Sequence, residues 1–256
     1  MAKPEPPLAV LGIAEDVSVE LRSERRGVAT WTVRATGETF RVKAACATSD
    51  GAAPDGASLE REARALSTIP GYADRFAPVL VDGALRTTWL DGTPGLASPE
   101  DFLACARALA AVHAVGWLHG DVQAGHFLRV DGTVVLLDWG LAHPIAEPLA
   151  DYRGGLVHAN APELCAQIRA EGSGVATTQT DVYAFGANAF YATTGRFPVV
   201  VPAGASYDDA VELIAATKPE LSHLAATRHG DVIAACLAPL EARPADMGSV
   251  VAMLTR

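Results

Sequence analysis

The sequence predicts an α+β fold in which antiparallel strands come first and helices make up most of the remainder. Residues 28–35 (VATWTVRA) and 38–44 (ETFRVKA) are rich in β-branched and aromatic residues, as strands are. Between them lies Thr36-Gly37, a pair typical of a tight hairpin turn. Apolar residues recur with helical spacing in residues 58–68, 101–115, 207–218 and 231–237. These observations predict a small antiparallel sheet with one helix, followed by a mainly helical part.

The composition indicates a folded, soluble domain of catalytic type. Half of the 256 residues are hydrophobic, which argues against disorder, and the length suffices for one substantial core or a compact two-lobed domain. The formal net charge of -10 argues against general affinity for nucleic acid or for an anionic membrane. No apolar run approaches the roughly 20 residues of a membrane-spanning helix. The sequence does not indicate an oligomeric state.

The N-terminus and the cysteines predict a cytoplasmic protein. Residues 1–7 are polar and rich in proline, and they lack the apolar core of a signal peptide. Four cysteines lie far apart without metal-ligand spacing, at Cys46, Cys105, Cys165 and Cys236. Three of them fall in apolar helical patterns, which is typical of buried thiols in a reducing compartment.

Two acidic residues stand out because each follows an apolar pattern. Asp121 comes after the helical pattern of residues 101–115, and Asp138 directly follows residues 133–137 (TVVLL), an apolar segment of strand length. Between them, Val130-Asp131-Gly132 indicates a hairpin turn. This order of elements brings both carboxylates to the same edge of one small sheet. One such carboxylate can orient a hydroxyl group while the other holds a metal ion.

The motifs around these aspartates resemble those of the protein kinase-like superfamily. His119-Gly120-Asp121 followed by Asp138-Trp139-Gly140 is similar to its catalytic loop and its metal-binding loop. Protein kinases usually have His-Arg-Asp and Asp-Phe-Gly, whereas phosphotransferases that act on aminoglycosides and choline usually have His-Gly-Asp. Ala161-Pro162-Glu163 and residues 180–186 (TDVYAFG) are similar to later motifs of protein kinases. These later motifs separate the chain from the aminoglycoside type.

The chain therefore resembles a divergent bacterial serine/threonine protein kinase of the eukaryotic type. The resemblance implies a two-lobed domain, with a nucleotide-binding lobe in residues 1–87 and a second lobe in residues 88–256 that carries both loops and the substrate side. It also implies that Asp181 braces the backbone of the catalytic loop and that Arg243 pairs with Glu163.

The resemblance also assigns a nucleotide site in the first lobe. Lys43 lies on the strand face opposite to Val42 and matches the lysine that pairs with phosphate. Glu62 matches the glutamate that positions this lysine, with Glu60 as the alternative. The hinge that bonds adenine through its backbone matches Thr88, Trp89 and Leu90.

The same region departs from the kinase pattern at two places. Only Gly27 remains of the glycine-rich loop that covers the phosphates. Arg25 and Arg26 either compensate with charge, or this loop does not grip phosphate. Arg41 stands where kinases usually have a small residue against the adenine ring. It would have to swing aside, stack on the base or block the pocket.

In the catalytic loop, the resemblance implies that Asp121 orients the attacking hydroxyl or accepts its proton. Gln123 replaces a lysine that touches the transferred phosphoryl group, and it brings no charge to the transition state. His126 replaces a metal-binding asparagine, so it is either a metal ligand through a neutral imidazole or a packed loop residue. Asp138 would bridge Mg²⁺ and the phosphate oxygens, and Trp139 belongs to the core.

Taken with these residues, the resemblance predicts a phosphotransferase that uses ATP with Mg²⁺ or Mn²⁺ and acts on a Ser/Thr hydroxyl of a protein or peptide, including a peptide-maturation substrate. The alternative is a pseudokinase that binds a partner protein, supported by the loss of glycines and by Arg41, Gln123 and His126. A small-molecule kinase is the third hypothesis, and it rests mainly on His119-Gly120-Asp121.

Overall fold

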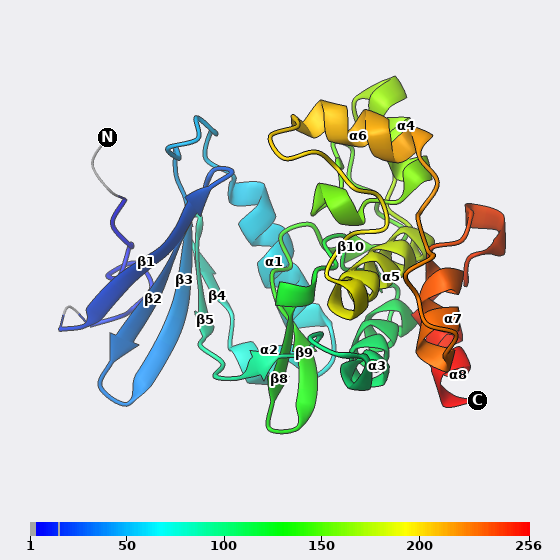
Figure 1. Cartoon of the computed structure of the whole chain (residues 1–256). Helices are drawn as coiled ribbons and strands as arrows, with labels where there is room; N and C mark the ends of the chain where they lie inside the picture. Colours follow the sequence, from blue (N-terminus) through cyan, green and yellow to red (C-terminus); the bar gives the residue numbers. More distant parts are fainter. Residues whose placement is uncertain (1–3, 15) are drawn as a thin grey trace. The chain divides into compact units, whose positions relative to one another are not determined.

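The chain divides into two compact units, of which the first ends at Asp91 and the second runs from Gly92 to Arg256. The computed structural model describes residues 4–14 and 16–256, and Figure 1 shows the order of their elements. Strands dominate the first unit and helices the second. The predicted α+β fold with an antiparallel N-terminal sheet is therefore confirmed.

A five-stranded antiparallel sheet forms the body of the first unit, in the order β1-β2-β3-β5-β4. Its strands are β1 Ser18–Arg25, β2 Val28–Ala35, β3 Glu38–Ala45, β4 Val79–Val81 and β5 Ala84–Thr88. The predicted Thr36-Gly37 turn joins β2 to β3, and Gly37 has a φ of 81°, a conformation that glycine adopts without steric cost. Strand β3 is central, because Arg41 lies opposite both Thr32 on β2 and Thr87 on β5.

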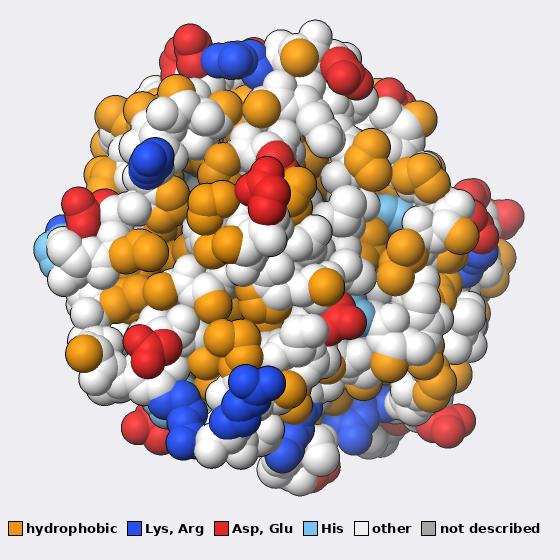
Figure 2. Space-filling model, turned by 90° about the vertical axis from the view of Figure 1, so that its right-hand side faces the viewer, with side chains coloured by type: hydrophobic (Ala, Val, Ile, Leu, Met, Phe, Trp, Pro, Cys, Tyr) orange, Lys and Arg blue, Asp and Glu red, His pale blue; other side chains and the backbone are white. Residues whose placement is uncertain are grey.

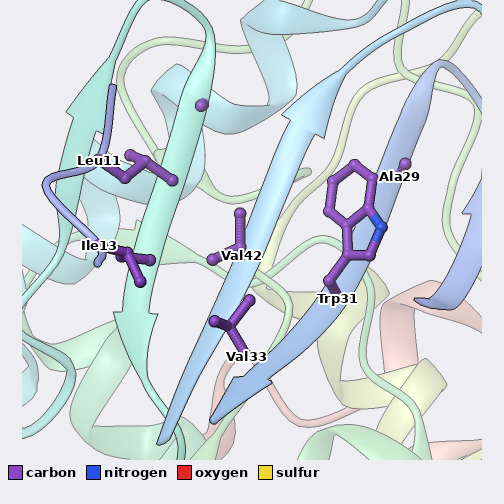
Figure 3. Packing of buried hydrophobic residues seen from close by; sticks show 7 residues of the cluster. Leu11, Ile13, Ala29, Trp31, Val33 and Val42 are labelled. Atoms are coloured by element: carbon purple, nitrogen blue, oxygen red, sulfur yellow. The ribbon is translucent and has the colours of Figure 1, made fainter. Parts of the chain in front are cut away.

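A hydrophobic core cluster of the first unit lies on one face of this sheet (Figure 3). Strand alternation places Trp31, Val33 and Val42 on that face, and all three are buried. Leu11 and Ile13, from the segment before β1, pack against the same cluster. The alternate residues of β2 and β3 therefore point to the opposite face of the sheet.

Helix α1 Gly56–Thr68 packs against β3, β4 and β5. It begins two residues before the predicted start at residue 58, because Asp55 is the N-cap and its carboxylate accepts a hydrogen bond from the N–H of Ser58 at 3.0 Å. The buried residues of α1 are Leu59, Glu62, Ala65 and Leu66. A short helix, α2 Tyr72–Phe76, follows before β4.

Six α-helices carry the second unit within the described residues. They are α3 Phe102–Ala114, α4 Pro162–Glu171, α5 Thr178–Thr194, α6 Tyr207–Ala216, α7 Arg228–Cys236 and α8 Met247–Thr255. Helix α3 packs against α8, α4 against α6, and α5 against α7. Helix α6 ends earlier than predicted because Lys218 precedes Pro219. A proline disfavours the helical backbone conformation at the residue before it. Helix α7 begins earlier than predicted, at Arg228, because Thr227 is its N-cap and its side chain accepts from the N–H of Gly230.

Short strands and 3₁₀ turns complete the second unit. The strands are β6 Thr93–Pro94, β7 Trp117–Leu118, β8 Phe127–Val130, β9 Thr133–Leu136 and β10 His143–Pro144. The 3₁₀ turns are η1 Pro99–Asp101, η2 Ala124–His126, η3 Val157–Ala159 and η4 Leu240–Ala242. Asp131 and Gly132, with φ values of 49° and 77°, form the turn between β8 and β9. The hairpin predicted between Asp121 and Asp138 is therefore confirmed.

Charged side chains are unevenly spread over the surface. On the face in Figure 2, hydrophobic side chains are interspersed with polar ones, and Lys and Arg side chains gather toward its lower edge. Among the described residues, no helix is both long enough and apolar enough to cross a membrane. The expected lack of affinity for nucleic acid stays a prediction.

Candidate functional site

In the first unit, the structure brings Lys43 and Glu62 together. Lys43 Nζ lies 2.6 Å from Glu62 Oε2, and the two side chains are 9% and 4% exposed. Alternation along β3 turns Lys43 away from the hydrophobic core and toward α1. On α1, Glu62 is buried whereas Glu60 is exposed, so Glu62 is the glutamate that reaches the lysine.

Arg41, two residues before Lys43, shares the sheet face of that lysine and contacts an aromatic ring. Its guanidinium carbon lies 5.7 Å from the centre of the Trp89 ring, within the range of cation–π attraction. The guanidinium carbon of Arg22 lies at the same distance from this ring. The N–H of Trp89 donates to the carbonyl of Thr39 at 2.9 Å. Of the predicted hinge residues, Trp89 therefore already has backbone and ring partners inside the first unit.

Gly27 occupies the turn between β1 and β2, where a side chain would clash with the backbone of a nearby segment. Its φ is 76°, and a Cβ there would lie 2.0 Å from the carbonyl oxygen of Ala53. The N–H of Gly27 donates to Thr48 Oγ1 at 3.1 Å, and the adjacent N–H of Arg26 donates to the Asp50 carboxylate at 2.9 Å. These amides thus have partners within the protein, unlike the free amides of a loop that cradles phosphate.

In the second unit, the β8–β9 hairpin brings the two predicted aspartates to one imidazole. His126 directly precedes β8, and its carbonyl accepts from the N–H of Leu137 at 2.8 Å. His126 Nε2 lies 3.6 Å from Asp138 Oδ2, and His126 Nδ1 lies 3.9 Å from Asp121 Oδ2. The expected convergence of the two carboxylates is therefore found, with His126 between them.

Asp138 has a backbone conformation that residues other than glycine rarely adopt. Its φ is 62°, in the left-handed region that aspartate tolerates better than most residues. Its side chain is 40% exposed, while the following Trp139 is buried and donates its indole N–H to the carbonyl of Leu136 at 3.1 Å. Trp139 anchors the loop in the core, as predicted, and the carboxylate of Asp138 remains accessible.

The carboxylate of Asp121 is held by two donors on one of its oxygens. Gln123 Nε2 donates to Asp121 Oδ1 at 2.6 Å, and the N–H of Leu156 donates to the same oxygen at 3.1 Å. The Asp121 side chain is 12% exposed. Gln123 thus contacts the predicted base, and Oδ2 is the oxygen left to face a hydroxyl group.

Asp181 on α5 braces the loop that carries Asp121, which confirms the expectation for this residue. Its carboxylate accepts from the N–H of His119 at 2.9 Å, from the N–H of Gly120 at 3.1 Å, and from the His113 ring at 3.2 Å. Burial alone would raise the pKa of Asp181, but these hydrogen bonds and the neighbouring histidines hold the pKa below its ordinary value.

Sequence reasoning missed a second support for this loop. Tyr152 donates its hydroxyl hydrogen to the carbonyl of Gly120 at 2.7 Å, and burial raises the pKa of Tyr152 well above its ordinary value, so it stays a donor. A Cβ at Gly155 would lie 1.8 Å from Asp121 Oδ1. The paired glycines Gly154-Gly155 are the signal that could have revealed this close backbone approach.

The donor atoms around Asp138 can hold a cation only with help from other ligands. Among the described residues, no group of three or more His, Cys, Asp and Glu side chains could hold a metal ion. His126 and Asp138 offer one nitrogen and one carboxylate. A cation here would take its remaining ligands from phosphate oxygens and water, as nucleotide-bound cations commonly do.

Known proteins resemble this chain over part of its length. No protein-family model matches it. Over 92 residues, or 36% of the chain, it is 42% identical to Serine/threonine-protein kinase PknK from two strains of Mycobacterium tuberculosis. The matched stretch covers 8% of that kinase. The similarity indicates a relation to a serine/threonine protein kinase over that stretch.

Proposed function

We propose that this chain is a phosphotransferase that moves the γ-phosphoryl group of ATP to a Ser/Thr hydroxyl of a protein or peptide. The observation that carries the proposal is the convergence of Asp121 and Asp138 on His126, on two loops joined by one hairpin. The partial similarity to Serine/threonine-protein kinase PknK supports the kinase class and this type of acceptor. A two-lobed kinase-like domain, with lobes at residues 1–87 and 88–256, is part of the proposal.

Each residue has a defined role in this reaction. Asp121 Oδ2 accepts a hydrogen bond from the acceptor hydroxyl and orients its oxygen for attack, while Gln123 keeps Oδ1 in place. Asp138, with His126, holds the divalent cation that neutralises charge on the phosphates when bound. Lys43, kept in position by Glu62, pairs with phosphate oxygens. Phosphoryl transfer depends mainly on positioning and charge, and these side chains supply both.

The proposal is tested by phosphate transfer from ATP to a generic protein acceptor and to the chain itself. We expect Asp121→Asn to lower the rate by about 100-fold or more, since a general base contributes that much, and Asp138→Ala to abolish transfer. Asp151→Asn is the matched control because Asp151 is exposed and lies between the same motifs. Equal rates in the wild type and in both site variants would contradict the proposal.

A partner-binding module with little catalysis is the second candidate, and the Arg41–Trp89 contact favours it. A nucleotide whose phosphate reaches Lys43 must extend along the same sheet face, where successive alternate residues are about 7 Å apart. Arg41 occupies the next position along that face, and its guanidinium lies over the Trp89 ring. A base can bind there only if Arg41 leaves the ring or stacks on the base.

We expect Arg41→Ala to bind ATP about tenfold more tightly than the wild type, because the cation–π contact that must be given up has a free energy of about 0.5–2 kcal/mol. Titration calorimetry with ATP and Mg²⁺ measures this change. Arg34→Ala is the control, since Arg34 is an exposed arginine of β2 and pairs with Glu20. Weaker binding by Arg41→Ala would show that Arg41 stacks on the base instead. If neither protein binds ATP, the partner-binding module becomes the better description.

A further inference from the structure

The cation site has a ligand set that distinguishes between divalent ions, an inference that rests on the proposed function. We infer that His126 makes this site selective for first-row transition-metal ions such as Mn²⁺ and Co²⁺ over Mg²⁺.

The hydrogen bonds of His126 determine its tautomer. Nδ1 lies 2.8 Å from the backbone carbonyl oxygen of Asp121. A carbonyl oxygen can only accept a hydrogen bond, so Nδ1 must carry the hydrogen. In the neutral ring, Nε2 then has its lone pair available. A histidine whose other nitrogen donates to a carbonyl oxygen is the usual arrangement of a metal ligand.

The lone pair of Nε2 lies near the Asp138 carboxylate without a direct hydrogen bond between them. Nε2 and Asp138 Oδ2 are 3.6 Å apart, which exceeds the usual length of an N–H···O bond. Two atoms that each lie about 2.1 Å from one metal ion are separated by about 3.0 Å at a right angle and about 3.4 Å at a tetrahedral angle. If the two atoms approached each other by about 0.2–0.6 Å, both could bind one ion.

The surroundings of His126 keep its ring in this orientation. The side chain is 13% exposed, and its ring centre lies 5.9 Å from that of His119. His119 itself is fixed by Trp139, at 4.9 Å between ring centres, and by the carbonyl of Leu137 at 3.0 Å. The imidazole is thus preorganised and not a mobile surface group.

The nature of the two ligands sets the preference for the ion. Mg²⁺ is a hard cation that takes oxygen ligands in a near-octahedral shell and gives up water reluctantly. Transition-metal ions accept an imidazole nitrogen more readily, and their affinity for such sites rises from Mn²⁺ to Co²⁺. With one imidazole and one carboxylate, His126 and Asp138 therefore favour these ions, while phosphate oxygens supply the remaining ligands.

The test compares cation binding in the wild type and in His126→Asn, which replaces the imidazole nitrogen by an amide oxygen. Titration calorimetry measures the dissociation constants of Mg²⁺, Mn²⁺ and Co²⁺ in the presence of a non-hydrolysable ATP analogue. We expect the wild type to bind Co²⁺ more tightly than Mg²⁺, and His126→Asn to reduce this ratio by about tenfold or more. His223→Asn, which changes an exposed histidine, should leave the ratio unchanged.

A second measurement needs no substitution. Pulsed electron paramagnetic resonance of Mn²⁺ bound to the wild type with the analogue should show coupling to an imidazole nitrogen. An equal ratio in wild type and His126→Asn, absent nitrogen coupling, or no cation binding would overturn the inference. Both measurements proceed without phosphate transfer. Cation binding that is selective, in a protein that transfers no phosphate, would therefore reject the proposed function alone. Phosphate transfer by a protein whose cation selectivity does not depend on His126 would reject only the inference.

Discussion

Gly155→Ala is expected to lower phosphate transfer by about 100-fold, because displacing a catalytic group by as little as about 1 Å can cost that much. A methyl group at this position would lie 1.8 Å from Asp121 Oδ1 and 2.4 Å from its Cγ, well inside van der Waals contact. Either Asp121 or the segment around Gly155 must move. Both movements change the direction in which Asp121 Oδ2 faces the acceptor hydroxyl.

The segment around Gly155 has little freedom to retreat. The N–H of Leu156 is hydrogen-bonded to Asp121 itself, and Tyr152 is tied to the Gly120 carbonyl. Between them, the backbone carbonyl of Arg153 accepts hydrogen bonds from the Tyr207 hydroxyl and from Asn160 Nδ2. Because these contacts fix both sides of the glycine, the clash acts mainly on the carboxylate.

Gly125→Ala provides the matched control for this prediction. Gly125 lies in the same loop as Asp121 and His126, yet a Cβ there meets nothing within 4 Å. We expect Gly125→Ala to keep most of the transfer rate. Thermal unfolding of both variants separates the effects, since overpacking at Gly155 should cost about 1–3 kcal/mol of stability. A Gly155→Ala protein with the wild-type rate would show that the approach of this segment does not position Asp121.

Glu163→Ala is expected to destabilise the protein by about 3 kcal/mol, the lower end of the range for breaking a buried ion pair. Arg243 donates to both carboxylate oxygens of Glu163, at 2.6 and 3.0 Å. The Arg243 side chain is 1% exposed, whereas that of Glu163 is 24% exposed. Removal of Glu163 therefore leaves a buried guanidinium without its counter-charge.

The expected loss lies at the lower end of that range because Arg243 retains other partners. It donates to the carbonyls of Ala238 and Gln179, and its guanidinium lies 4.8 Å from the Tyr183 ring centre. Asp208→Ala is the control, since the Arg153–Asp208 pair has side chains 50% and 85% exposed. Exposed pairs of this kind contribute about 0–1 kcal/mol. Urea unfolding measures both variants, and equal midpoints would contradict the prediction.

Local patterns predicted the parts of the site that lie close together in the sequence. The Thr36-Gly37 turn and the alternation along β3 placed Lys43 on the face that meets α1. The turn at Asp131-Gly132 brought Asp121 and Asp138 to one end of a hairpin. Such features follow from backbone geometry over a few residues, which composition and spacing reveal directly.

Features that depend on distant segments were not predictable in the same way. The sequence left open whether the loop at Gly27 grips phosphate, and the structure shows the N–H of Gly27 bonded to Thr48 and the Ala53 carbonyl where a Cβ would lie. Arg41 had three open alternatives, and the structure shows it on the Trp89 ring. Neither contact has a sequence signature, because each joins residues that strand pairing or a loop brings together.

The sequence alone therefore determined the α+β class, the hairpins and the two aspartates of the candidate site. Only the tertiary structure decided that Glu62 and not Glu60 meets Lys43, that Gly155 touches Asp121, and that His126 directs Nε2 at Asp138. The physical reason is how far apart in the sequence the interacting residues lie. Periodicity and turn chemistry act over neighbouring residues, whereas the orientation of a side chain depends on hydrogen bonds and steric contacts from segments tens of residues away.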